Sequence, residues 1–286
     1  MNVPWPTNAL PVRGLPPTIY PANARLNWIS TDSRESFDRT GHPIYGEHDI
    51  EYAFNAQGYR TTAFERSDNL RIIAIGCSYV FGVGLPTAAL FHSLVCGWLS
   101  ERLSRSATVW NLGLPGTSND YIARMLHIAV PALDPHLILV NFTHSDRREY
   151  VSVQGEIMPY CPGWHPRDPV ARTVKANLAD LSSGCDDDLN LFRNYKSVES
   201  LLSSRLWLYS TIAHPLRRPS ASELEWGCLA SVHEHMNPAH YAGTLRTIDV
   251  ARDASHPGPA SHLALARSCW DRLCSTGGVE RLMAAC

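Results

Sequence analysis

The segment that most constrains the fold is LRIIAIG at residues 70–76, whose apolar residues are continuous and end in glycine. A strand with one face in water alternates apolar and polar residues, whereas a strand buried on both faces is apolar throughout, as in parallel sheets. ATVWNLG at residues 107–113 and HLILVNF at residues 136–142 are two further strand candidates. Together, these segments predict a parallel sheet.

Helical patterns separate the predicted strands. Large apolar residues recur at helical spacing in residues 87–103, which predicts a helix there. Residues 117–130 predict a second helix, in which Thr117 or Ser118 caps the start and Asp120 completes a capping box. Alternating strands and helices are typical of an α/β fold, a parallel sheet with helices on both faces.

Two regions lie outside this alternating pattern. Residues 1–66 carry six prolines before residue 22, and we expect an N-terminal extension wrapped on a main domain at residues 67–286. Within the extension, EYAFNAQGYRTTAF predicts a short hairpin with a Gln-Gly turn. Residues 151–236 are long for a simple connection and predict a helical lid or specificity insert. Asp186–Asp188 favour a helix N-terminus there through the helix dipole.

Composition excludes several classes of partner. The formal net charge is -2 and no basic patch stands out, which argues against nucleic acid and anionic membranes. No segment has the apolar length that spans a membrane. The eight cysteines form no CxxC pair, and the N-terminus has no signal-peptide pattern. We therefore expect a cytoplasmic protein with reduced thiols.

Ser78 is the first candidate for chemistry, because it directly follows the predicted strand at residues 70–76. Ligands of open parallel sheets bind at the carboxyl ends of strands. Gly113 and residues 143–149 also follow strand ends, so these segments should meet at one edge of the sheet. A neutral serine hydroxyl becomes a nucleophile only when a base lies within hydrogen-bond reach.

The segment DASHPGPASH offers such a base. Asp253 precedes His256 by three residues, so its carboxylate can bond Nδ1 of the ring and leave Nε2 free to accept a hydroxyl proton. Alone, this pair is more often an incidental feature of a surface loop. The following PGP turn, the closing helix and the serine at a strand end favour a catalytic triad instead.

Three segments, GCSYVFGVGL, NLGLPGTSNDY and DASHPGPASH, resemble in sequence and order the first, second and last conserved blocks of the SGNH/GDSL hydrolases. The resemblance implies a flavodoxin-like three-layer α/β/α fold and ester hydrolysis through a serine. On the matching positions, it makes Ser78 the nucleophile, His256 the base and Asp253 the acid that orients the base. It also implies that the backbone N–H groups of Ser78 and Gly113 form part of the oxyanion hole.

Two positions depart from the family pattern. Cys77 stands where the family often has aspartate, and it is either a thiol beside the site or a small buried side chain. The third block usually supplies an asparagine whose amide donates to the oxyanion, and the aligned residue here is Ser145. Thr143, His144 or Asn119 are alternative donors. Losing one oxyanion donor typically costs about 3–4 kcal/mol of transition-state stabilisation.

Arg147, Arg148 and Glu149 follow the same predicted strand. An arginine at this place can clamp a carboxylate or phosphate of a substrate, or it can belong to a structural ion pair. Both interpretations stay open. Cys77, Asn119, His144 and Arg147 are therefore the predicted substrate-binding residues.

Cys228, His233, His235 and His240 are zinc-ligand residue types close together in sequence. Their spacing matches no metal motif, so we predict neither a metal nor another cofactor.

The leading functional hypothesis is a serine esterase that acts on a small acyl ester, such as an O-acetyl group on a carbohydrate or another metabolite. One alternative is an acyltransferase that uses the same acyl-enzyme with an alcohol or amine acceptor. Another is a non-catalytic ligand-binding protein with the same fold. The partner is thus expected to be a small-molecule ester, and the oligomeric state stays open.

Overall fold

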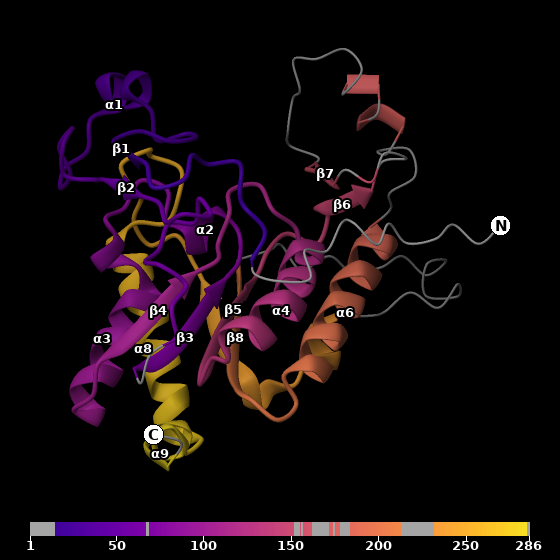
Figure 1. Cartoon of the computed structure of the whole chain (residues 1–286). Helices are drawn as coiled ribbons and strands as arrows, with labels where there is room; N and C mark the ends of the chain where they lie inside the picture. Colours follow the sequence, from indigo (N-terminus) through magenta and orange to yellow (C-terminus); the bar gives the residue numbers. More distant parts are fainter. Residues whose placement is uncertain are drawn as a thin grey trace.

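The centre of the computed structural model is a parallel sheet of five strands (Figure 1). Their spatial order is β4 (Ala107–Asn111), β3 (Leu70–Ile75), β5 (Leu137–Phe142), β8 (Leu206–Ile212) and β9 (Tyr241–Leu245). In chain order this is 2-1-3-4-5, which is the flavodoxin-like arrangement. The predicted fold class is therefore confirmed, together with the strands expected in each of the three apolar segments.

The structure describes residues 15–66, 69–151, 155, 157–161, 172–173, 175–177, 184–212 and 232–284.

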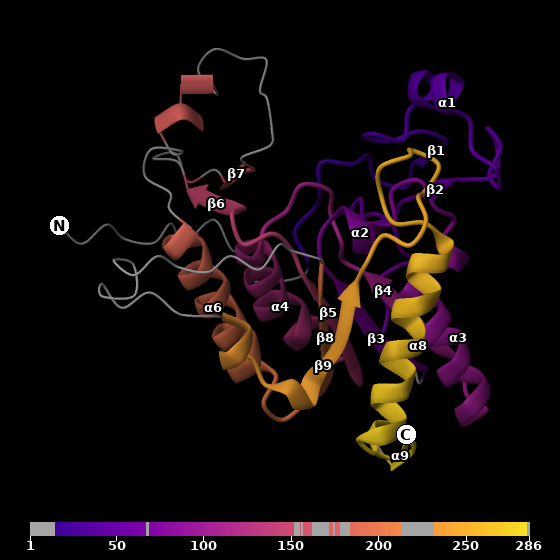
Figure 2. The ribbon, with the colours of Figure 1, turned by 180° about the vertical axis from the view of Figure 1, so that it is seen from behind.

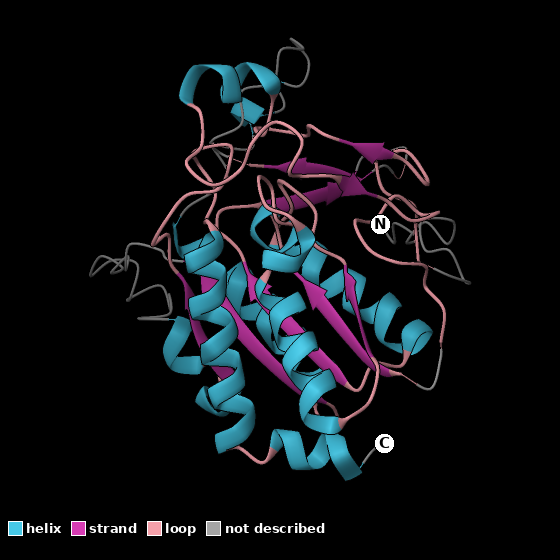
Figure 3. Ribbon diagram, turned by 90° about the vertical axis from the view of Figure 1, so that its left-hand side faces the viewer, coloured by secondary structure: helices cyan, strands magenta, loops and turns pink. Residues whose placement is uncertain are grey.

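Helices cover both faces of the sheet (Figure 3). One layer contains α4 (Asn119–Leu133) and α6 (Gly184–Leu201), and the other contains α3 (Phe91–Leu103) and α8 (Pro259–Ser275). The 3-10 turn η1 (Thr87–Ala89) precedes α3, and α9 (Gly278–Ala284) follows α8 (Figure 2). Of the two residues predicted to cap α4, Ser118 is the one whose side chain accepts a hydrogen bond, from the amide of Tyr121.

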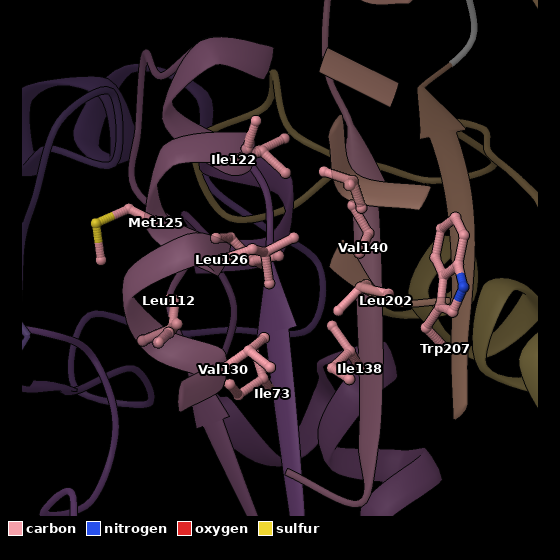
Figure 4. Packing of buried hydrophobic residues seen from close by; sticks show 14 of the residues in the cluster. Ile73, Leu112, Ile122, Met125, Leu126, Val130, Ile138, Val140, Leu202 and Trp207 are labelled. Carbon is pink, nitrogen blue, oxygen red and sulfur yellow. The ribbon is translucent and has the colours of Figure 1, made fainter. Parts of the chain in front are cut away.

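The two cores explain why β3 is apolar without alternation. Ile73 and Ile75 belong to the core under α4 and α6, where Figure 4 shows Ile73 close to Val130 of α4. Ile72 and Ala74 belong to the opposite core, under α3 and α8. Because successive side chains of a strand point to opposite faces, the positions of β3 from Ile72 to Ile75 are all apolar, and only Arg71 near the start of the strand is charged.

Much of the region predicted as an insert belongs to the sandwich. Helix α6 packs on α4, and β8 is the fourth parallel strand, buried along its whole length. In the sequence, no glycine or proline lies between the helix and the strand. The pattern therefore predicts one helical stretch and gives no signal for a separate strand. The expected acidic helix start is confirmed, since Asp186 and Asp187 lie in the first turn of α6.

A smaller part of this region lies outside the sheet. It forms a two-stranded antiparallel ribbon of β6 (Arg148–Val151) and β7 (Ile157–Tyr160). The 3-10 turns η2 (Val232–His235) and η3 (Pro238–His240) lead into β9. The connection between β8 and η2, residues 213–231, lies outside the described residues.

The N-terminal extension lies over α2 (Ser78–Phe81) in Figure 1. It contains β1 (Arg25–Leu26), α1 (Arg34–Thr40) and β2 (Tyr52–Ala53). β2 pairs with β1 and not with a partner inside residues 51–64, where the sequence predicted a hairpin. The tight turn at Gln57-Gly58 is present, and the amide of Asn55 donates to the carbonyl of Tyr59 across it (2.9 Å).

Among the helices described, none combines the length and the apolar character that crossing a bilayer requires.

Candidate active site

Ser78 is the first residue of α2, directly beyond the carboxyl end of β3, and its side chain is buried. The chain can turn there because Gly76 has no side chain. A Cβ on Gly76 would lie 2.5 Å from Cγ2 of Val80 and 2.8 Å from the carbonyl oxygen of Asn141. The helix ends after one turn at Gly82, which has a left-handed φ of 81°. These two glycines thus allow the tight turn that carries Ser78, which follows β3 and packs beside β5.

The carbonyl end of α2 is held by a buried cation, Arg60. Its Nη1 donates to the carbonyls of Gly82 (2.6 Å) and Phe81 (3.1 Å), and its Nη2 donates to that of Leu85 (2.7 Å). The carbonyls at the end of a helix carry partial negative charge, so a guanidinium suits this place. Burial lowers the pKa of Arg60 to about 10, which leaves it charged at neutral pH. The sequence did not point to this residue.

Asp253 and His256 form the predicted pair. Their side chains meet at 2.6 Å between Oδ2 and Nδ1, and because a carboxylate can only accept, Nδ1 carries the proton. The amides of Ser255 and His256 donate to Oδ1 of Asp253 at 3.2 and 3.0 Å. Ala254, with a left-handed φ of 57°, turns the chain between Asp253 and His256. No hydrogen bond of His256 Nε2 is found among the described residues.

Two hydroxyl groups complete the surroundings of the Asp253 carboxylate. Ser255 and Thr31 both donate to Oδ2, at 2.6 and 2.5 Å. Burial opposes the ionisation of Asp253, but the hydrogen bonds from His256, Ser255 and Thr31 outweigh it and lower the pKa far below the usual range. The carboxylate is therefore ionised at neutral pH. Thr31 comes from the extension, and no sequence signal pointed to it.

The His256 loop lies against the segment that carries Ser78. The ring of Tyr79 packs edge-on against that of His256, with centroids 5.6 Å apart. The amide of Arg252 donates to the carbonyl of Gly84 (3.0 Å). Among the described residues no hydrogen bond joins Ser78 to His256, and Ser78 Oγ points to Cys77 Sγ at 4.0 Å. Hydrogen bonds between base and nucleophile often tighten only in the substrate complex.

The second loop, after β4, lies beside the same turn. Leu114 donates its amide, and Thr117 its hydroxyl, to the carbonyl of Gly76, at 3.2 and 3.4 Å. The predicted oxyanion donor, the amide of Gly113, donates to Oδ1 of Asn111 at 2.9 Å. Gly116, which the sequence interpretation did not consider, has a left-handed φ of 77° and open space at its Cβ position. The amide predicted as an oxyanion donor is thus bound within its own loop.

The third loop, after β5, is tied to α4 by Asn119. This fully buried side chain accepts from the amide of Thr143 (2.9 Å) and donates to the carbonyls of Thr143 (3.2 Å) and His144 (3.4 Å). The structure thus gives the Asn119 amide a role in holding the loop. The Ser145 carbonyl accepts from the guanidinium of Arg148, and no hydrogen bond of its hydroxyl is found in the described part of the chain.

The charged residues after Ser145 divide into two groups. Arg148 pairs with Asp186 (3.2 Å) and Asp187 (2.6 Å) at the start of α6, and Glu149 pairs with Arg124 at 2.9 Å. These are structural ion pairs.

Arg147 is different, because it spans two of the loops around Ser78. It donates to the carbonyl of Thr117 (3.5 Å) and to the hydroxyl of Thr143 (3.3 Å). Burial is the main cause that raises the pKa of Tyr79, and the charge of Arg147 opposes it. Cys77, also predicted to bind substrate, is buried.

In the described part of the chain, no three His, Cys, Asp or Glu side chains are gathered in a way that would hold a metal ion. Of the zinc-type residues considered above, Cys228 and the side chain of His233 lie outside the described residues.

No family model and no curated protein matches this chain. Solved structures with a similar fold include the lipase Lip_vut3 from a goat rumen metagenome. It is 14% identical, with a TM-score of 0.42, and the match covers 71% of this chain and 97% of the lipase. The psychrotrophic esterase EstA from Pseudoalteromonas sp. is 13% identical, with a TM-score of 0.43, and coverage is 73% and 100%.

A third similar structure is a putative lipolytic protein of the G-D-S-L family from Desulfitobacterium hafniense DCB-2. It is 11% identical, with a TM-score of 0.40 and coverage of 72% and 100%. The first two structures are thus described as a lipase and an esterase, and the third as a member of the G-D-S-L family.

Proposed function

We propose that this chain is a serine hydrolase of the SGNH/GDSL type, an esterase that cleaves a small acyl ester. The observation that carries the proposal is the bond between the ionised, buried Asp253 and Nδ1 of His256 (2.6 Å). It occurs in a loop whose histidine touches Tyr79, the neighbour of Ser78. A histidine oriented by a carboxylate beside a serine at a strand end is an arrangement that activates a hydroxyl for attack.

In the proposed mechanism, Ser78 Oγ attacks the acyl carbon while His256 Nε2 accepts the hydroxyl proton. Asp253 stabilises the imidazolium that forms. The tetrahedral intermediate collapses, the bond to the alcohol oxygen breaks, and His256 returns the proton to the departing alcohol. Water then attacks the acyl-serine, again with His256 as base. The products are a carboxylic acid and free Ser78.

The oxyanion would be stabilised by N–H and O–H groups of the three loops that surround Ser78. The backbone amide of Ser78 is the first donor. The loop after β4 supplies an amide, from Gly113 if its bond to Asn111 is exchanged or from Gly116. The Ser145 hydroxyl is the side-chain donor in place of the family's asparagine. Each such donor typically contributes about 3–4 kcal/mol to the transition state.

The substrate class that fits this proposal is an ester with a small acyl group, such as an O-acetyl carbohydrate or another acylated metabolite. Arg147 would bind a carboxylate or phosphate on the alcohol part, because a guanidinium donates to two oxygens of such a group at once. Transfer of the acyl group to an alcohol acceptor uses the same acyl-serine and is the second candidate activity.

Labelling with a fluorophosphonate tests the proposal most directly. The intact chain, Ser78→Ala and His256→Ala are treated in parallel at mildly alkaline pH, and the adduct is located by mass spectrometry. We expect one stable adduct on Ser78, none at that position in Ser78→Ala, and much slower labelling in His256→Ala. Folded protein that forms no adduct on Ser78 would contradict the proposal. A panel of acyl esters, with and without acceptor alcohols, then separates hydrolysis from transfer.

A further inference from the structure

A hydroxyl group of the N-terminal extension lies on the proposed catalytic acid. Thr31 Oγ1 donates to Asp253 Oδ2 at 2.5 Å and lies 3.5 Å from Nδ1 of His256. In Figures 1 and 2 the loop between β9 and α8 rises beside β1 and β2 of the extension. Building on the proposed function, we propose that Thr31 is a positioning residue that orients the Asp253–His256 pair and tunes the basicity of His256.

The hydrogen bonds around Asp253 explain how one hydroxyl can act on the histidine. Oδ2 accepts from Thr31, Ser255 and Nδ1 of His256. A donor that binds a carboxylate stabilises its negative charge and makes the carboxylate less basic. With Thr31 in place, Asp253 stabilises the imidazolium less strongly than it would alone. Removing the hydroxyl should therefore strengthen the stabilisation of the imidazolium by Asp253.

Thr31 is held in place through the next residue. Asp32 forms a buried ion pair with Arg252, the neighbour of Asp253: Nε donates to Oδ1 (3.0 Å) and Nη2 to Oδ2 (2.8 Å). Both side chains are at most 1% exposed. Adjacent residues of the extension therefore bind adjacent residues of the catalytic loop, and a bidentate arginine–carboxylate pair restricts rotation as well as distance.

Further contacts fix this pair from both sides. Arg252 donates to the carbonyls of Asn27, Gly46 and Glu47. The Tyr52 hydroxyl donates to Asp32 Oδ2 at 2.5 Å and accepts from the amide of Gly84 at 2.8 Å, so the cluster also touches the segment that follows α2. The position of Thr31 is thus set by a buried polar network and not by the exposed surface of the extension.

The test compares Thr31→Val, which keeps the shape and removes the hydroxyl, with Thr31→Ser, which keeps the hydroxyl. Thr40→Val is the matched control, because Thr40 is also in the extension but donates only to the Ser36 carbonyl within α1 (2.9 Å). Thr31→Ala is a second variant without the hydroxyl, should valine disturb folding. The full chain is used throughout, and the rate of Ser78 labelling by the fluorophosphonate is measured against pH.

We expect Thr31→Val to slow labelling about 10-fold, because the Asp253–His256 pair loses one of the contacts that orient it. The acid limb of its pH profile should move to higher pH by roughly half a unit, because His256 would bind its proton more tightly. Thr31→Ser should restore most of the rate and the profile, and Thr40→Val should match the unaltered chain.

Two results would overturn the inference while leaving the proposed function intact. One is wild-type rate and pH profile in Thr31→Val and Thr31→Ala. The other is a slower rate with an unmoved profile that Thr31→Ser does not rescue, which would indicate a structural role only. Absence of Ser78 labelling in the unaltered chain would instead refute the proposed function, and this inference with it.

Discussion

The two loops that flank Ser78 are built in different ways. The loop at residues 249–258 carries the proposed acid–base pair, and Asp253 in it accepts five hydrogen bonds from side chains and amides. The loop at residues 143–149 carries the expected oxyanion side chain, and its hydrogen bonds hold its own backbone to Asn119 and Arg148. Hydrogen bonds thus orient the side chains of the first loop, whereas the hydrogen bonds of the second loop hold its backbone in place.

This difference indicates which contacts fix the position of each catalytic group in the proposed enzyme. Orientation of the base depends on a buried ion pair between the extension and the loop, over a separation of 220 residues in sequence. Stabilisation of the oxyanion would depend on short local donors, namely backbone amides and the Ser145 hydroxyl. Substitutions on the two sides should therefore differ in size and in what they change.

The largest effect is expected from Asp253→Asn. An amide in this position cannot stabilise the imidazolium and favours the wrong tautomer of the histidine, so kcat/KM for ester hydrolysis should fall by about 10³- to 10⁴-fold. The stability of the fold against urea, measured in parallel, separates this effect from unfolding. A loss of less than about 10-fold would mean that Asp253 is not the acid of the triad.

The next largest effect should be on stability, in Arg252→Met. Removing the guanidinium leaves Asp32 buried without its partner, which typically costs about 3–5 kcal/mol in the free energy of unfolding. In the double variant Asp32→Leu with Arg252→Met, much of this loss should be recovered, because no buried charge is left alone. Urea denaturation followed by fluorescence measures both.

Arg34→Met is the control for this experiment. Arg34 pairs with Glu47 at 2.8 Å in the same region, but its side chain is 63% exposed. An exposed pair contributes little, so stability should change by less than about 1 kcal/mol. Equal losses in Arg34→Met and Arg252→Met would show that the buried pair has no special weight.

A smaller effect, confined to the rate, is expected on the oxyanion side. If the Ser145 hydroxyl donates to the oxyanion, Ser145→Ala should lower kcat by about 10²-fold with little change in KM, because the interaction exists only in the transition state. Steady-state kinetics with a small acyl ester measures this. An unchanged kcat would mean that backbone amides alone stabilise the oxyanion.

The pH dependence of stability involves the support beneath the acid–base loop. His262, in the first turns of α8, accepts a hydrogen bond on Nδ1 from the amide of Phe91 at 3.2 Å. Burial is the main cause that lowers the pKa of His262 to about 3 and that of His92 to about 4. Both are therefore neutral in the folded chain, whereas in the unfolded chain they bind protons below about pH 6.5.

Since the unfolded state binds more protons in this range, the free energy of unfolding should decrease as the pH falls from about 6.5 to about 4, by roughly 1.4 kcal/mol per pH unit for each histidine. Urea titrations at several pH values measure the slope. His262→Asn keeps an acceptor for Phe91 but cannot titrate, so its slope should be shallower. An unchanged slope would mean that His262 is not the group responsible.

Local patterns in the sequence were sufficient for the features that depend on near neighbours. The apolar run of β3 and the Asp253–His256 bond involve residues within a few positions of one another, whereas the choice of Ser118 over Thr117 as the cap of α4 came from the structure. Hydrogen bonds and alternation at such short range are set by backbone geometry, which the order of residues determines directly. The alternation of strands and helices predicted a parallel sheet, whereas the flavodoxin-like strand order was implied by the family resemblance.

Only the tertiary structure decided what surrounds these features. Thr31 reaches Asp253, and Arg60 holds the end of α2, through contacts that no sequence spacing encodes. It also assigned the residues of β8 to the sheet. The physical reason is that a buried charge or hydroxyl is stable only beside its partner, and for residues far apart in the chain the fold alone brings that partner into place.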